Sequence, residues 1–159
     1  MSAALEFADF LQSVPAFAEF TPAELAVLDQ AMAVDHYPDG HQFISEETRG
    51  TAIFLIVEGK VIATHRRAKL RGVDVIEYLG PGDLFGLVAL IDHRREWATY
   101  RAVGPVTAAS LPYNVFDLLF TANAPIAYHF QGLIAVQLAH DLRACTQTLA
   151  KAFAQRIPD

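Results

Sequence analysis

The sequence has one cysteine, Cys145, among 159 residues, which excludes an intramolecular disulfide framework and fits a reducing compartment. Positive charge is also scarce: 12 Lys and Arg against 18 Asp and Glu give a formal net charge of -6, which does not favour nucleic acid as a partner. No apolar run approaches the roughly 20 residues that span a bilayer, and the acidic N-terminus lacks the basic start of a signal peptide. We therefore expect a cytoplasmic protein with neither a membrane nor a DNA partner.

Motifs of catalysis and metal binding are missing as well. There is no Gly-rich loop of Walker or Rossmann type, and no Ser, His and Asp grouping with local motif support. His36 and His41 flank a turn, but no H-x-H followed by Glu is present, which argues against a cupin-type metal enzyme. We expect no metal, no catalytic residue and no enzymatic activity.

What is present supports one domain with a sizeable core, because 53% of the residues are hydrophobic. Residues 1–36 are predicted to be helical. A first helix extends from about Ala3 and is stopped by Pro15, and a second begins at Thr21, where Pro22 and Glu24 complete a capping box.

Residues 37–111 alternate short apolar runs with turns, which predicts an antiparallel sandwich or barrel. Glu58-Gly59 is interpreted as a turn between two strands of this set. The expected strands are Thr51–Val57, Lys60–Thr64, Val73–Tyr78, Ala98–Val103 and Val106–Leu111.

The segment 79–102 combines a Gly80-Pro81-Gly82-Asp83 turn, a short apolar run and a charged loop from Asp92 to Glu96. A turn followed by one short helical turn presents several backbone N–H groups together. Such an arrangement is a ready site for a phosphate.

These features resemble the cyclic nucleotide-binding domain family, whose effector domain is found in catabolite activator-like regulators. Leu79-Gly-Pro-Gly-Asp-Leu-Phe-Gly86 is similar to the start of its phosphate-binding cassette, and Ile53–Val61 to its central strand. The resemblance implies one domain over residues 1–159: a β-roll of the jelly-roll (double-stranded β-helix) type at 37–111, a cassette at 79–102, and C-terminal helices at 112–157.

Two positions depart from the family pattern. Leu87 stands where the resemblance implies a Glu for the ribose hydroxyl, and Glu96 falls where it implies an Arg for the phosphate. Arg94 and Arg95 are alternative phosphate partners. The ligand is a cyclic nucleotide, another small anion, or none. The candidate ligand-binding residues are Phe85, Gly86, Leu87, Val88, Arg94, Arg95, Glu96, Ala98 and Thr99.

The long Ala-rich segment from Ile126 to about Arg156 is predicted to be one helix with an apolar stripe at spacings of three and four. The resemblance implies that this helix pairs two protomers, whereas the alternative is packing on its own β-roll. The candidate dimer residues are Ile134, Leu138, Leu142, Cys145 and Leu149.

No pattern of a DNA recognition helix follows this stripe. A basic segment at 65–71 is interpreted as a solvated hairpin tip, with a contact to an acidic partner as the alternative. The sequence thus predicts a regulatory or sensor domain with altered or lost cAMP binding. The open alternatives are a dimeric module that binds a regulatory protein, and a sensor of a different nucleotide or small anion.

Overall fold

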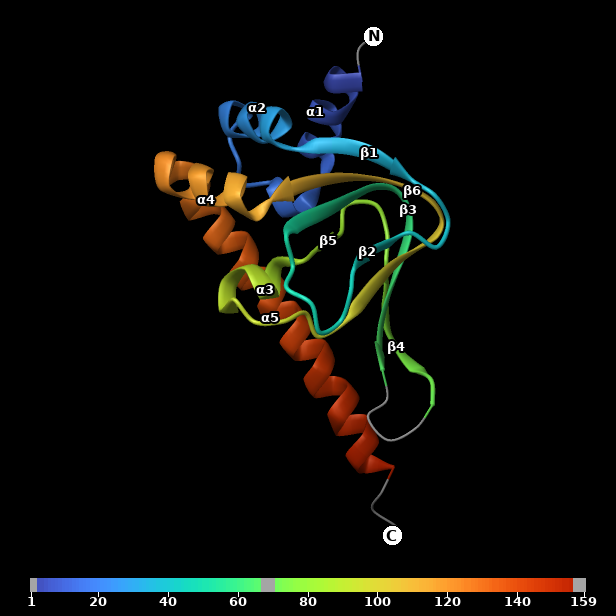
Figure 1. The fold of residues 1–159 in the computed structure, drawn as a ribbon. Coiled ribbons are helices and arrows are strands. Elements are labelled where there is room, and N and C mark those ends of the chain that lie inside the picture. Colours follow the sequence, from blue (N-terminus) through green and yellow to red (C-terminus); the bar gives the residue numbers. More distant parts are fainter. Residues whose placement is uncertain (1–2, 67–70, 156–159) are drawn as a thin grey trace.

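Two long antiparallel strands organise the fold in the computed structural model, which describes residues 3–66 and 71–155 (Figure 1). β3 (Ala52–Arg66) and β6 (Thr99–Pro112) pair along nearly their whole length. β1 (Ala33–Tyr37) and β2 (Gln42–Ile44) pair with β6, while β4 (Val73–Leu79) and β5 (Leu84–Phe85) pair with β3. This antiparallel six-stranded sheet with flanking helices confirms the predicted β-roll.

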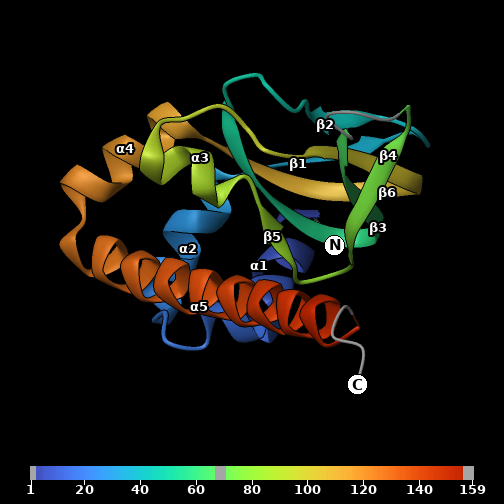
Figure 2. The same cartoon turned by 90° about the horizontal axis from the view of Figure 1, so that it is seen from below.

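The helices cover one end and one side of the roll. α1 (Ala3–Ser13), the 3-10 turn η1 (Pro15–Phe17), α2 (Pro22–Ala31) and α4 (Tyr113–Ala122) gather at the end. α3 (Leu87–Asp92) lies in the cassette, and α5 (Ala124–Ala154) passes beneath α3 and β5 (Figure 2). The predicted capping box of α2 is present: the Thr21 hydroxyl accepts from the Glu24 N–H, and the Glu24 carboxylate accepts from the Thr21 N–H.

The apolar residues form two cores. One joins the terminal helices to the nearby ends of β3 and β6, with Leu11, Leu28, Leu55, Leu111, Ile126 and Phe130 among its members. The other fills the inside of the roll, where the Phe85 ring stacks on Phe54 at 5.1 Å and on Tyr100 at 4.9 Å between ring centroids. The inner core therefore places aromatic rings beside the cassette.

The predicted turn at Glu58-Gly59 was wrong, because β3 continues through it as one strand. Its pairing with β6 shifts register around Glu58, which marks a bulge, and Gly59 has a φ of 96° there. A Cβ at Gly59 would come within 2.5 Å of the Pro105 carbonyl oxygen, so glycine at this position allows β3 and β6 to approach each other closely. The strands expected at Ala98–Val103 and Val106–Leu111 are likewise one strand, β6.

Other boundaries moved by a few residues. The roll begins at Ala33 instead of residue 37, because Met32 is already extended at the end of α2. Of the basic segment 65–71, residues 67–70 lie outside the described part of the chain, and Arg66 ends β3.

Candidate functional site

A small cavity of about 40 Å³ lies between the cassette and α5. Of the predicted ligand-binding residues, Phe85, Gly86, Leu87, Val88 and Glu96 line it. The other lining residues come from β4, β6 and α5, together with Leu84. Sequence reasoning did not assign Glu77, Tyr100, Gln137 and Asp141 to the site, and it placed Ile134 and Leu138 only at a dimer interface.

The cassette takes its shape from Gly86. This residue has a φ of 87° at the N-terminus of α3, and a Cβ there would approach the Ala52 carbonyl oxygen to 2.6 Å. The Gly86 carbonyl accepts a hydrogen bond from the Tyr113 hydroxyl, which ties the cassette to α4. Leu87 then points into the protein and is 4% exposed. An apolar side chain therefore occupies the position where the family resemblance implies a carboxylate.

Glu96 is held by a short antiparallel contact with the segment after β2. Its N–H donates to the Thr48 carbonyl at 2.8 Å, and its carbonyl accepts from the Glu47 N–H at 2.9 Å. This pairing turns the side chain inward, where it is 7% exposed. Gly50 makes room for it, because a Cβ at residue 50 would clash with Glu96 Oε1.

The buried Glu96 carboxyl is electrostatically unfavourable in its ionised form. Among the described residues, its Oε1 atom has no hydrogen-bond partner. Burial raises the pKa of Glu96, the neighbouring Tyr113 hydroxyl partly opposes this, and the charge of Asp92 raises the pKa further. Burial likewise raises the pKa of Tyr100, and the carboxylates around the cavity add to the increase.

Arg94 and Arg95 are exposed and do not line the cavity. The Arg94 N–H donates to Asp92 Oδ1 at 2.9 Å, and Arg95 forms an isolated β-bridge with Arg49. Ala98 is buried, and the Thr99 hydroxyl accepts from the Glu46 N–H at 3.0 Å. Neither arginine stands where it would neutralise Glu96.

Glu46 shows how a buried carboxylate is satisfied elsewhere in the same roll. Its Oε2 accepts from the Arg66 N–H at 3.0 Å, and its Oε1 lies 3.4 Å from the His65 ring nitrogen. The His65 ring also stacks on Trp97 at 4.4 Å. Both side chains are buried, but among the described residues a backbone N–H donates to the Glu46 carboxylate, whereas Glu96 Oε1 has no hydrogen-bond partner.

Replacing Glu96 with Gln is expected to stabilise the fold at neutral pH. The pKa of Glu96 is raised in the folded state. The free energy of unfolding of the wild type is therefore not reduced by this group at low pH, and it falls as the pH rises through the folded-state pKa. The Gln variant lacks this loss and should be more stable by about 1–3 kcal/mol near pH 8, with the difference shrinking towards pH 5. Urea unfolding at several pH values measures it, with the exposed Glu58→Gln as control. Equal stability of Glu96→Gln and wild type at pH 8 would contradict it.

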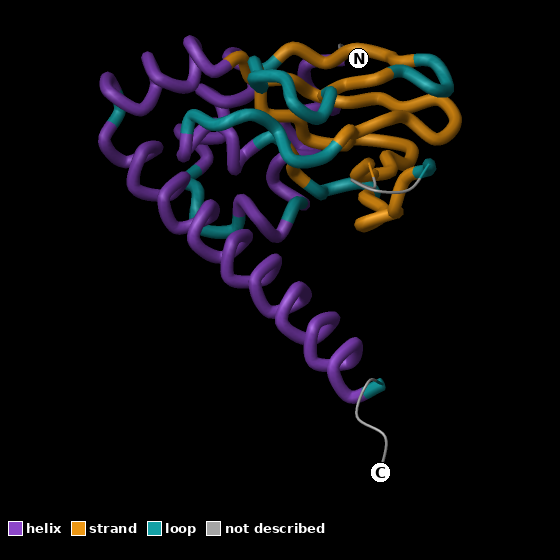
Figure 3. Tube along the Cα trace, turned by 60° about the horizontal axis from the view of Figure 1, so that its bottom comes forward, coloured by secondary structure: helices purple, strands orange, loops and turns teal. Residues whose placement is uncertain are grey.

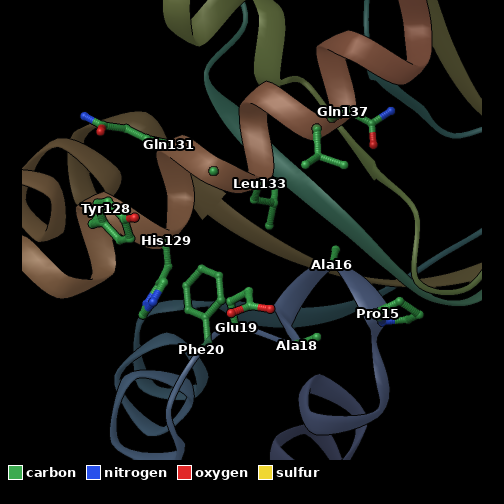
Figure 4. A pocket seen from close by; sticks show the side chains of 12 residues that line it. Pro15, Ala16, Ala18, Glu19, Phe20, Tyr128, His129, Gln131, Leu133 and Gln137 are labelled. Carbon is green, nitrogen blue, oxygen red and sulfur yellow. The ribbon is translucent and has the colours of Figure 1, made fainter. Parts of the chain in front are cut away.

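A second hollow, of about 600 Å³, separates η1 from the first half of α5 (Figure 4). Phe20, His129 and Leu133 line it, and the His129 ring nitrogen lies 2.9 Å from Glu24 Oε1. Burial alone would raise the pKa of Glu24, but hydrogen bonds with Thr21 and His129 outweigh it and leave the pKa lowered. A polar pair between Glu24 of α2 and His129 of α5 therefore adds to the apolar packing beside this groove.

The described residues contain no cluster of three or more His, Cys, Asp or Glu that could hold a metal ion. Within the same residues, no helix combines the length and the apolar character needed to cross a bilayer.

Comparison with known proteins identifies the family. The profile of the cyclic nucleotide-binding domain matches residues 34–123, so the chain belongs to that family. A cAMP-dependent protein kinase regulatory subunit from Mycosarcoma maydis is 36% identical over 102 residues, which cover 64% of this chain and only 19% of that subunit. The matched part of the chain therefore spans less than a fifth of that regulatory subunit.

Solved structures share the fold. A cyclic nucleotide-binding domain from Methylobacillus flagellatus KT superposes with a TM-score of 0.77 at 18% identity, covering 98% of this chain and 85% of that one. The regulatory subunit of a cAMP-independent protein kinase A from Trypanosoma brucei superposes with a TM-score of 0.64 at 21% identity, covering 84% and 54%. A triple variant of that subunit, in which one substitution introduces an arginine, is bound to cAMP in its A site.

Proposed function

We propose that this chain is a non-enzymatic, cytoplasmic regulatory domain whose site no longer takes cAMP or cGMP in the way the family resemblance implies. The buried Glu96 carries this proposal. An acid at the phosphate position would repel a cyclic phosphate, and the buried Leu87 offers no acceptor to the ribose. The cAMP-independent relative supports the idea that this fold can regulate without cAMP.

The size of the cavity supports the same proposal. Pockets for small-molecule ligands usually enclose about 300–1,000 Å³, whereas this one encloses about 40 Å³. Ile134 and Leu138 of α5 form part of the wall that narrows this cavity. A nucleotide would have to displace α5 as well as overcome the charge of Glu96.

We further propose that α5 is the output element and pairs two protomers. Its second half leaves the body of the domain (Figure 3), and every residue from 138 to 155 is exposed. The groove beside η1 gives the first half of the helix room to shift. A ligand or regulatory protein that binds one position of α5 better than another would move the equilibrium between them.

A thermal-shift titration tests the loss of cyclic nucleotide binding. A domain with a Kd of about 10 μM would gain about 2.7 kcal/mol at 1 mM ligand, or about 5–10 °C in Tm for a chain of this size. Here 1 mM cAMP or cGMP is expected to raise Tm by less than about 1 °C, no more than 5′-AMP does. A saturable shift of several degrees with cAMP alone would contradict the proposal.

A further inference from the structure

The starting observation is the unpartnered oxygen of Glu96. Its side chain is only 7% exposed, and among the described residues its Oε1 atom has no hydrogen-bond partner. The neighbouring Tyr113 hydroxyl donates its proton to the Gly86 carbonyl. Glu96 is therefore a buried acceptor that lines a cavity and lacks the donor that such a group normally has.

The rest of the lining has the same sign of charge. Glu77 and Asp141 lie in the wall contributed by β4 and α5, and none of the described lining residues is Lys, Arg or His. Partial desolvation, with the charges of Asp141 and Asp83, raises the pKa of the Glu77 carboxyl, while His140 lowers it in part. Asp141 accepts from the Gln137 amide at 2.9 Å and lies 3.6 Å from His140. Three acidic residues thus line one small cavity.

Aromatic surface completes the site. The Phe85 and Tyr100 rings both line the cavity and are nearly parallel, at 11°. Carboxylates beside aromatic rings attract organic cations through ion pairing and cation–π contacts. Such a ligand fits better than a metal ion, because the described acids form no metal-holding cluster.

We propose that this cavity binds the amino or guanidinium head group of a small organic cation. The inference rests on the proposed function, since it assigns a new ligand class to the site from which the cyclic phosphate is excluded. The head group donates to Glu96 inside the cavity, and the rest of the molecule leads out past Glu77 and Asp141. A volume of about 40 Å³ suits a head group of a few atoms, given that one water needs about 10–15 Å³ on the same measure.

Because α5 supplies Gln137 and Asp141 to the cavity wall, a bound ligand would also influence the position of this helix. A cation between Glu96 and Asp141 would hold α5 against the cassette. Without it, the repulsion between the acids favours separation of the helix from the roll.

The test is a titration followed by two-dimensional amide NMR, with n-butylamine, putrescine and neutral n-butanol as probes at constant ionic strength. Both amines are expected to shift Gly86, Tyr100 and Asp141 with Kd values of about 1 mM or below, and butanol is not. Glu96→Gln should weaken both amines at least about 10-fold. Asp141→Asn, at an exposed position, should weaken putrescine more than n-butylamine. The control Glu58→Gln should bind both amines as wild type does.

Equal shifts with butanol and the amines, or equal amine affinity of Glu96→Gln and wild type, would overturn the inference. Absence of amine binding together with absence of cAMP binding would also overturn it, while leaving the proposed function intact. Binding of cAMP at about 10 μM or tighter in the same titration would instead contradict the proposed function.

Discussion

Substituting Leu142 with Glu is expected to convert the proposed homodimer into a folded monomer. Leu142 is 68% exposed in the single chain, and Leu149 and Phe153 follow it with 54% and 63% exposure. Exposed apolar surface of this kind on a projecting helix usually marks an interface. In a twofold pair, residue 142 would lie near its own mate, so the variant would place two negative charges at the seam.

The dissociation constant should rise at least about 100-fold, which corresponds to about 2.7 kcal/mol. Sedimentation equilibrium at about 20 μM measures it. Gln147→Glu is the matched control, because it adds the same charge to the same exposed helix about 140° away around its axis. A wild-type monomer at tens of micromolar would show that the stripe does not pair two copies.

The double variant Leu87→Glu with Glu96→Arg is expected to gain at least about 100-fold in cAMP affinity over wild type. It restores the two polar partners that the family resemblance implies, each a charge-assisted contact of about 1.5–3 kcal/mol. Arginine at 96 would also face the carboxylates Glu77 and Asp141 across the cavity, which favours its burial.

Each single variant separates the two contributions. Glu96→Arg alone should account for most of the gain, since it replaces repulsion with attraction, and Leu87→Glu alone should give little. Arg94→Ala and Arg95→Ala in the double variant should leave cAMP affinity unchanged, because neither residue lines the cavity. A folded double variant with wild-type affinity would show that closure by α5, and not the charge at 96, excludes the nucleotide.

The fold could be predicted because its signals are local. The capping box at Thr21 and the Gly-Pro-Gly-Asp turn each depend on a few adjacent residues. The error at Glu58-Gly59 arose because a bulge and a turn share the same local signal. Only the pairing with β6, about 45 residues further along the chain, distinguishes them.

The site was harder to predict because its walls come from distant segments. Leu87 and Glu96 were found by counting along the cassette, but Tyr113 and Gly50 come close to Glu96 only through the packing of the roll. Asp141 lines the cavity because α5 passes along it. The apolar stripe in the sequence predicts which face of the helix is apolar, but it does not predict what the residues beside that face contact. One signal was available in the sequence. Gly50 is not part of a recognisable turn motif, and a glycine outside a turn often marks a point where another segment of the protein approaches the backbone closely.

Isothermal titration calorimetry of the wild-type protein with cAMP is the most direct test of whether Glu96 has replaced the phosphate site. Near pH 7 and physiological salt, no binding heat should be detected up to about 1 mM cAMP, and Glu96→Arg in the same cell should bind. Wild-type binding at micromolar affinity would contradict this and would mean that another cation reaches the phosphate when α5 moves.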